Sequence, residues 1–171
     1  SPEDCTALIE KLRLLYDYVI IDTTSMFSKL NLDMLDISTI VTFLGVVDFI
    51  PTIKNMKIGN DTLQNLNYDT HKIRLVLNRS DAKTRIPLES VEKLLGEGFY
   101  HILPNDFQAA SESIATGVPL VLGDSDGVLA EEIRKLISRY TNKAYVPERE
   151  AVPVKSQEPR KSGFFGKIFG R

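Results

Sequence analysis

Four short apolar runs, separated by stretches with helical spacing, are the feature that most restricts how this chain can fold. The runs are rich in Val, Ile and Leu and lie at residues 18–21, 39–44, 73–78 and 100–103. A strand that is apolar at nearly every position is typical of a sheet covered on both faces. We therefore predict a strand at each run.

Helical segments alternate with these runs. Leu8, Leu12 and Leu15 share one helical face, while charged residues occupy the other side. This spacing predicts a helix over residues 6–15, and similar patterns predict helices near 30–36, 52–66, 88–95, 106–116 and 127–141. Alternating strands and helices imply parallel strands joined by right-handed crossovers. The predicted fold class is α/β, a mostly parallel sheet with helices on both faces.

Charge and proline divide the chain into three parts. Residues 1–142 carry 14 basic and 20 acidic side chains, a net charge of −6, and form the predicted folded domain. Residues 143–171 carry 7 basic and 3 acidic side chains, a net charge of +4. Within them we predict a flexible, Pro-containing linker at 143–159 and an amphipathic helix at 160–171. The acidic domain argues against a nucleic-acid partner, and none is expected.

Three features favour a cytoplasmic protein. The single cysteine, Cys5, cannot form an internal disulfide. The first residues do not resemble a signal peptide. No apolar run approaches the roughly 20 residues of a membrane-spanning helix.

Polar residues follow several of the predicted strands at their carboxyl ends, where ligands bind in open α/β sheets. Asp22 follows the first run and is suited to holding a hydrated Mg²⁺ beside a phosphate. The alternative is that Asp22 caps a turn or a helix. Response-regulator receivers also place an acid at a strand end, but they need a later strand that ends in Lys. In this chain the later strand ends Asn78-Arg79, which excludes them.

Four motifs occur in order along residues 12–140. They are Leu15-Tyr-Asp-Tyr-Val-Ile-Ile-Asp-Thr23, Ile73-Arg-Leu-Val-Leu-Asn-Arg79, Ile102-Leu-Pro-Asn-Asp106 and Gly117-Val-Pro-Leu-Val121. In this order and spacing the chain resembles the MinD/ParA family of deviant Walker ATPases. Asp48 to Pro51 and Lys54-Asn55 make it most similar to the CpaE/TadZ pilus-assembly branch.

The resemblance implies roles for particular residues. In the intact protein, ATP and Mg²⁺ would be the cofactors, and Asp22 would be a Walker-B-like catalytic residue that holds a water on Mg²⁺. The side of the site that meets adenine would consist of Asn78, Arg79, Pro104 and Asp106. For Asn78 the alternative is a turn cap. No direct metal ligand is expected, because His71 and His101 have no partner at ligand spacing.

Two departures from the family pattern limit these roles. The glycine-rich phosphate-binding loop, Walker A, is missing from these residues. We therefore expect this chain to be the C-terminal portion of a longer ATPase and, by itself, neither to bind ATP nor to hydrolyse it. Thr23-Thr24-Ser25 stands where the family usually has Pro, which puts the switch function of that loop in question.

The last twelve residues suit a membrane surface. In a helical projection one face is apolar and cations flank it, which is typical of a helix that lies in the membrane interface. The residues expected to contact the membrane are Lys161, Phe164, Phe165, Lys167, Ile168 and Phe169. The alternative is that the Phe residues dock on the domain or on a partner.

Together these features predict a peripheral protein on the inner face of the cell membrane. An anionic membrane surface, a second copy of the chain, and pilus-assembly or secretion proteins are the expected partners. A homodimer would present two tails, and the second would insert at high effective concentration. A non-hydrolysing scaffold or adaptor with the same fold, or a MinD-type cell-division regulator, is the alternative.

Overall fold

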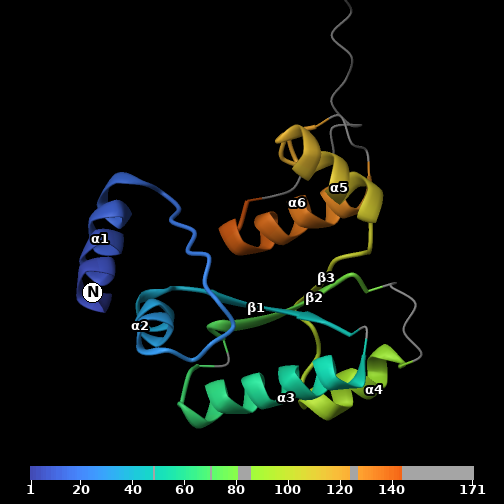
Figure 1. Cartoon of the computed structure of the whole chain (residues 1–171), viewed down its shortest axis with the longest axis horizontal. Helices are drawn as coiled ribbons and strands as arrows, with labels where there is room; N and C mark the ends of the chain where they lie inside the picture. Colours follow the sequence, from blue (N-terminus) through green and yellow to red (C-terminus); the bar gives the residue numbers. More distant parts are fainter. Residues whose placement is uncertain (48, 70, 81–85, 124–126, 144–171) are drawn as a thin grey trace, which may run out of the picture.

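The computed structural model describes residues 1–47, 49–69, 71–80, 86–123 and 127–143. Within them, three parallel strands form one sheet in the order β1-β2-β3 (Figure 1). The strands are β1 (Val41–Val46), β2 (Ile73–Asn78) and β3 (His101–Ile102). The prediction of a mostly parallel sheet is confirmed.

Helices cover both faces of this sheet, as predicted. Helices α3 (Ile50–Asn65) and α4 (Leu88–Leu95) lie on one face, and α5 (Phe107–Thr116) and α6 (Val128–Thr141) lie on the other (Figure 1). Consecutive residues of β2 point to opposite faces. Leu75 and Leu77 therefore belong to the core under α3 and α4. Val76, between them, packs with residues of α6 and the β3–α5 connection.

Two further helices lie beside the sheet, near the start of β1 (Figure 1). They are α1 (Pro2–Leu15) and α2 (Lys29–Ile37). Helix α1 begins earlier than the apolar spacing predicts, because its first residues form a capping box. The Ser1 hydroxyl accepts a hydrogen bond from the Asp4 amide, and Pro2 occupies the first turn.

The helices that pack on the sheet end close to their predicted limits, and glycine explains two of those ends. Gly96 follows α4 with φ 85° and Gly117 follows α5 with φ 72°. Both residues have left-handed backbone, which glycine adopts without a steric penalty. Helix α6 ends at Asn142, which also has left-handed backbone.

The prediction of a strand at residues 18–21 is wrong. These residues lie in an irregular segment between α1 and α2, and Ile20 is 94% exposed. A strand needs a neighbour that accepts its backbone hydrogen bonds. Among the described residues β1 pairs with β2 alone, so the run at 18–21 has the apolar composition of a strand and no strand beside it.

The run at 100–103 forms a shorter strand than predicted, but its backbone bonds extend beyond it. The Tyr100 amide donates to the Leu75 carbonyl at 2.8 Å, and the Leu103 amide donates to the Leu77 carbonyl at 2.7 Å. Pro104 follows directly and has no amide hydrogen to continue the ladder. The carboxyl ends of β2 and β3 are therefore level with each other.

Candidate functional site

The carboxyl edge of β2 and β3 brings together the residues predicted on the adenine side. Asn78 is the last residue of β2, and Pro104 follows β3 after Leu103. The Ser80 amide donates to the Leu103 carbonyl at 3.1 Å, so the chain leaving β2 turns across the end of β3. Asn78 and Pro104 are half-buried at this edge. The edge therefore offers one amide side chain and one apolar ring to a ligand.

Arg79 closes this edge on the outer side. Its backbone has φ 57°, an uncommon conformation for a residue with a side chain. Its side-chain Nε donates to Asn105 Oδ1 at 3.4 Å, which links the loop after β2 to the loop after β3. Left-handed backbone at a non-glycine residue often marks a functional site. At Arg79 it directs the exposed side chain across the sheet edge.

Asp106 begins helix α5. Its Oδ1 accepts a hydrogen bond from the Ala109 amide at 3.0 Å, the usual geometry of an N-cap. This carboxylate therefore positions α5, whose amino end lies at the same edge as Pro104. Asp106 was predicted on the adenine side, and the structure shows it as the N-cap of α5.

Asp22 lies apart from this edge. It is exposed, it follows no strand, and it makes no hydrogen bond or ion pair with the described part of the chain. The segment that carries it joins α1 to α2 beside the beginning of β1, whereas Asn78 stands where β2 ends (Figure 1). The structure therefore does not bring Asp22 together with the four residues of the predicted adenine side.

Asn31 holds the loop after Asp22, and sequence reasoning missed it. Asn31 is 8% exposed, and its side-chain amide donates to the Thr24 carbonyl and hydroxyl and to the Met26 carbonyl, at 2.6 to 3.1 Å. A polar residue on a helix gives no signal in the sequence that its partners lie in a preceding loop. The loop at 23–25 is thus fixed to α2.

ATP and Mg²⁺ fit this structure only in part. The Asn78 amide can donate and accept at the edge of a purine ring. The phosphate and magnesium side does not fit, because these residues contain no glycine-rich loop and Asp22 lies elsewhere. Within the described ranges no three His, Cys, Asp or Glu side chains gather as a metal site would require.

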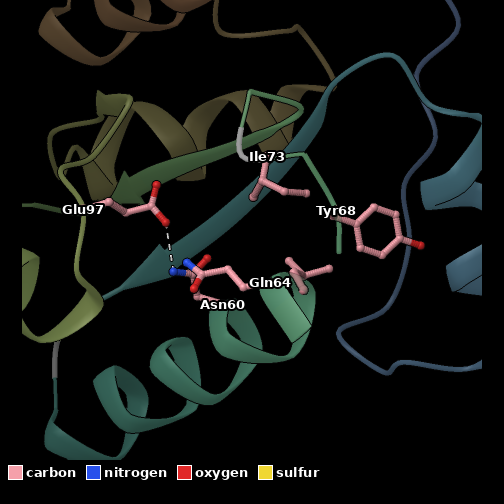
Figure 2. A pocket seen from close by; sticks show the side chains of 6 residues that line it. Asn60, Gln64, Tyr68, Ile73 and Glu97 are labelled. Atoms are coloured by element: carbon pink, nitrogen blue, oxygen red, sulfur yellow. Dashed lines mark hydrogen bonds between the residues drawn. The ribbon is translucent and has the colours of Figure 1, made fainter. Parts of the chain in front are cut away.

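A polar pair made of buried Asn60 and half-buried Glu97 lies away from this edge. Figure 2 shows Asn60 of α3 and Glu97 pointing toward each other, while the ring of Tyr68 points away from them. Asn60 Nδ2 donates to Glu97 Oε1 at 2.9 Å. The cavity beside them is about 10 Å³, which is the space of one water molecule. It is too small for a nucleotide, and the pair serves to satisfy the buried Asn60.

Several predicted residues lie outside the described part of the chain. They are Asp48 and the six residues expected to contact the membrane, Lys161, Phe164, Phe165, Lys167, Ile168 and Phe169. Only Lys143 of the predicted linker is described. In the ranges that are described, no helix has the length and apolarity needed to cross a membrane.

Comparison with solved structures identifies the fold. A ParA family ATPase from Chlorobium tepidum TLS aligns with a TM-score of 0.71 and 21% identity, over 78% of this chain and 55% of that one. The MinD cell division protein of Aquifex aeolicus aligns with a TM-score of 0.68 and 15% identity, over 86% of this chain and 63% of that one. The fold is that of ParA and MinD. No protein-family model matches the sequence, and no curated protein is recognisably similar to it.

These matches cover only part of each solved structure, which limits what can be inferred from them. The chain spans less than two thirds of the length of either solved structure. Identities of this size show a common P-loop NTPase-like fold and leave activity, substrate and partners open. Function must therefore be argued from the residues of this chain.

Proposed function

We propose that this chain is the C-terminal part of a MinD/ParA-like ATPase of the CpaE/TadZ type. It binds the inner face of the cell membrane reversibly and positions pilus-assembly or secretion machinery. The observation that carries the proposal is the meeting of Asn78, Arg79, Pro104 and Asp106 at one sheet edge, in a fold shared with ParA and MinD.

The nucleotide half of the proposal assigns adenine to this edge. Half-buried Asn78 supplies the donor and acceptor, Pro104 supplies an apolar surface, and Arg79 lies on the outer rim. The phosphate-binding loop would come from a segment upstream of Ser1 in a longer protein. Asp22 would act as the Walker-B-like residue only in that longer protein. For the 171 residues alone we expect no ATP hydrolysis.

The membrane half rests on the C-terminal sequence. Three aromatic residues and one isoleucine share one helical face, and no acidic residue occurs from Arg160 onward. One such helix binds a membrane weakly, and two on a dimer bind far more tightly. ATP-dependent dimerisation would therefore make membrane attachment reversible.

Vesicle co-sedimentation tests the membrane half. We expect the parent chain to pellet with anionic vesicles and Phe165→Glu to remain in the supernatant, because a charge interrupts the apolar face. Phe107→Glu is the matched control, since Phe107 is 77% exposed on α5 and outside the tail. It should pellet like the parent.

A leucine-zipper fusion of the chain supplies the second tail if one is too weak to sediment. If the linked dimer also fails to bind anionic vesicles, the tail does not bind lipid, and the membrane part of the proposal is wrong. The tail would then be assigned to docking on a protein.

Nucleotide binding by the longer natural protein tests the other half. Asn78→Ala should weaken binding of a fluorescent ATP analogue at least about fivefold, because one or two hydrogen bonds are lost. The control is Asn65→Ala, an exposed change at the end of α3, which should leave binding unchanged. Equal binding by both variants would show that adenine does not bind at this edge.

A non-hydrolysing scaffold or adaptor is the second candidate. Thr23-Thr24-Ser25 replaces the family's usual Pro, and Asn31 binds this loop to α2 by three hydrogen bonds. A loop held in this way is poorly suited to switch with nucleotide state. Vesicle binding by the longer protein without any ATP turnover would favour the adaptor. A MinD-type cell-division regulator would hydrolyse ATP and would differ in its protein partners.

A further inference from the structure

Side chains of β1, β2 and the residue before β3 gather beneath the carboxyl end of α6, at the edge of the sheet opposite the candidate nucleotide site. Thr42 of β1 and Arg74 of β2 are register partners. Tyr100 precedes β3 and bonds to β2 through its amide. Tyr140, near the end of α6, lies with its hydroxyl 2.9 Å from Thr42 Oγ1. The carboxyl end of α6 is thereby fixed to the sheet.

Two arginines pack against the same aromatic ring in this region. Arg139 Cζ lies 3.8 Å from the centroid of the Tyr100 ring, and Arg74 Cζ lies 4.8 Å from it. The Tyr100 and Tyr140 rings are stacked, with centroids 5.7 Å apart and planes 6° apart. We call these four residues the arginine–tyrosine cluster. Stacking on an aromatic ring holds each guanidinium in place without neutralising its charge.

The cluster has positive charge and no acidic partner. Among the described residues neither Arg74 nor Arg139 forms an ion pair, and the same holds for Lys143 just beyond α6. On α6, Glu132 is paired with His101 at 3.2 Å and with Lys135 at 2.8 Å. The cations of the cluster are therefore available to an external anion.

Donors in the cluster also remain unused. Arg74 Nε has no hydrogen-bond partner among the described residues, but it is buried, so an external phosphate would meet the other nitrogens of this guanidinium group. Arg139 Nη1 donates to the Tyr100 carbonyl and lies 3.4 Å from His101 Nδ1, and the residue is otherwise exposed. Burial raises the pKa of Tyr140, and a tyrosine hydroxyl is in any case protonated at neutral pH. Fixed guanidinium groups with free donors are well suited to phosphate oxygens.

We propose that the arginine–tyrosine cluster, together with Lys143, binds the phosphates of anionic lipid headgroups and turns the amino end of the sheet toward the membrane. This inference rests on the proposed function, because it requires the tail to bring the domain to the bilayer. It adds a second contact, on the folded domain, and it sets the domain's orientation.

Two observations favour lipid as the source of phosphate. The domain carries a net charge of −6, so an anionic surface repels it unless a cationic region faces that surface. The predicted linker begins at Lys143, directly after the carboxyl end of α6, beneath which the cluster lies. The tail would thus insert close to the cluster. The acidic remainder of the domain disfavours DNA, whose phosphates have the same chemistry.

Vesicle binding by a double variant tests the proposal on the full chain. Arg139→Gln/Lys143→Gln should weaken binding to vesicles of phosphatidylglycerol and phosphatidylcholine about fivefold per cation removed. The matched control is Lys54→Gln/Lys93→Gln, two exposed lysines of α3 and α4 on the far face of the sheet. This control should change binding by less than about twofold, and binding to pure phosphatidylcholine should not differ between the variants.

Further variants separate this inference from the proposed function and from misfolding. Phe165→Glu reports on the tail alone, so normal binding by that variant would contradict the membrane function whatever the cluster does. Lys143 lies beyond α6 and its ammonium nitrogen is 5.5 Å from the centroid of the Tyr18 ring, so Lys143→Gln changes no side chain of α6 and should still cost about fivefold. Equal binding by the cluster variant and the control variant would overturn the proposal. Loss of binding to a short DNA duplex, with vesicle binding unchanged, would overturn it in favour of nucleic acid.

Discussion

Strand β2 and the run at 18–21 have similar sequences and opposite environments. Val76 and Leu77 of β2 are completely buried, whereas Ile20 is 94% exposed and Tyr18 is 56% exposed. Both runs are short, apolar and followed by a polar residue. The difference is in their neighbours. β2 lies between two strands and under helices on both faces, while the run at 18–21 has no strand to pair with among the described residues.

Strand β1 lies between these extremes, and its two faces differ. Phe43 packs against the core under α3, and Gly45 lies against Met56 of the same helix. Leu44, which points to the other face, is 55% exposed. One edge of β1 bonds to β2, and its other edge has no strand beside it among the described residues. The sheet is therefore well packed at β2 and open at β1. Burial in this fold therefore follows from strand pairing more than from local composition.

The largest expected effect contrasts the two runs directly. Leu77→Ala should lower the free energy of unfolding by about 3 kcal/mol, since it removes a fully buried side chain and leaves a cavity. Ile20→Ala should change it by less than about 0.5 kcal/mol. Urea unfolding followed by circular dichroism measures both. A large loss for Ile20→Ala would mean that another chain covers this run in solution.

A second contrast tests the two faces of β1. A methyl group at Gly45 would overlap the terminal methyl and the sulfur of Met56, so Gly45→Ala should cost about 2 kcal/mol. Leu44→Ala, one residue earlier and on the open face, should cost less than about 1 kcal/mol. Thermal unfolding compares them. The Gly45→Ala/Met56→Ala double variant should lose less stability than the sum of the single variants, and strict additivity would contradict the observed packing of Met56 on Gly45.

A third prediction concerns the loop after Asp22. Asn31→Ala removes three hydrogen bonds from this loop and should cost about 1.5 kcal/mol. The loss should be local, so protease cleavage between residues 23 and 28 should become faster while β2 stays protected from hydrogen exchange. Asn65→Ala is the control, at an exposed helix end. Unchanged cleavage in Asn31→Ala would show that other contacts fix the loop.

The smallest predicted effect depends on pH. Burial, and then the hydrogen bond to Asp36 at 2.6 Å, raise the pKa of Tyr68 to about 12. The folded state therefore keeps the Tyr68 proton at a pH where the unfolded chain loses it. This contribution to stability is complete below a pH of about 10 and is lost as the pH rises toward about 12.

Tyr68→Phe should cost about 1 kcal/mol at a pH of about 8, and the difference from the parent should shrink toward a pH of about 12. Urea unfolding across this range measures the difference. A gap between parent and variant that stays constant with pH would show that the Tyr68 proton is not held by Asp36. Because Asp36 belongs to α2, the measurement also reports how firmly α2 is attached to the rest of the fold.

Most elements were predictable from local signals. The predicted limits of α4 and β2 agree with the structure, because periodic apolar residues mark both and Gly96 ends the helix. Helix α1 extends further than predicted, since its capping box lies before the first leucine. The four residues of the predicted adenine side meet at one edge because parallel strands bring their carboxyl ends together. The arginine–tyrosine cluster was not predictable, because Arg74, Tyr100 and Tyr140 are far apart in sequence.

The class of fold, the position of most helices and the edge that gathers the candidate nucleotide residues could all be predicted from the sequence. They follow from the periodicity of apolar residues, which is a local property of the sequence, and from the general geometry of parallel strands. Three features could be seen only in the folded chain: residues 18–21 stay outside the sheet, Asn31 fixes a loop, and two arginines pack on one tyrosine ring. Each of these depends on which distant segments become neighbours, and hydrogen bonds, stacking and burial act only between groups that meet in space.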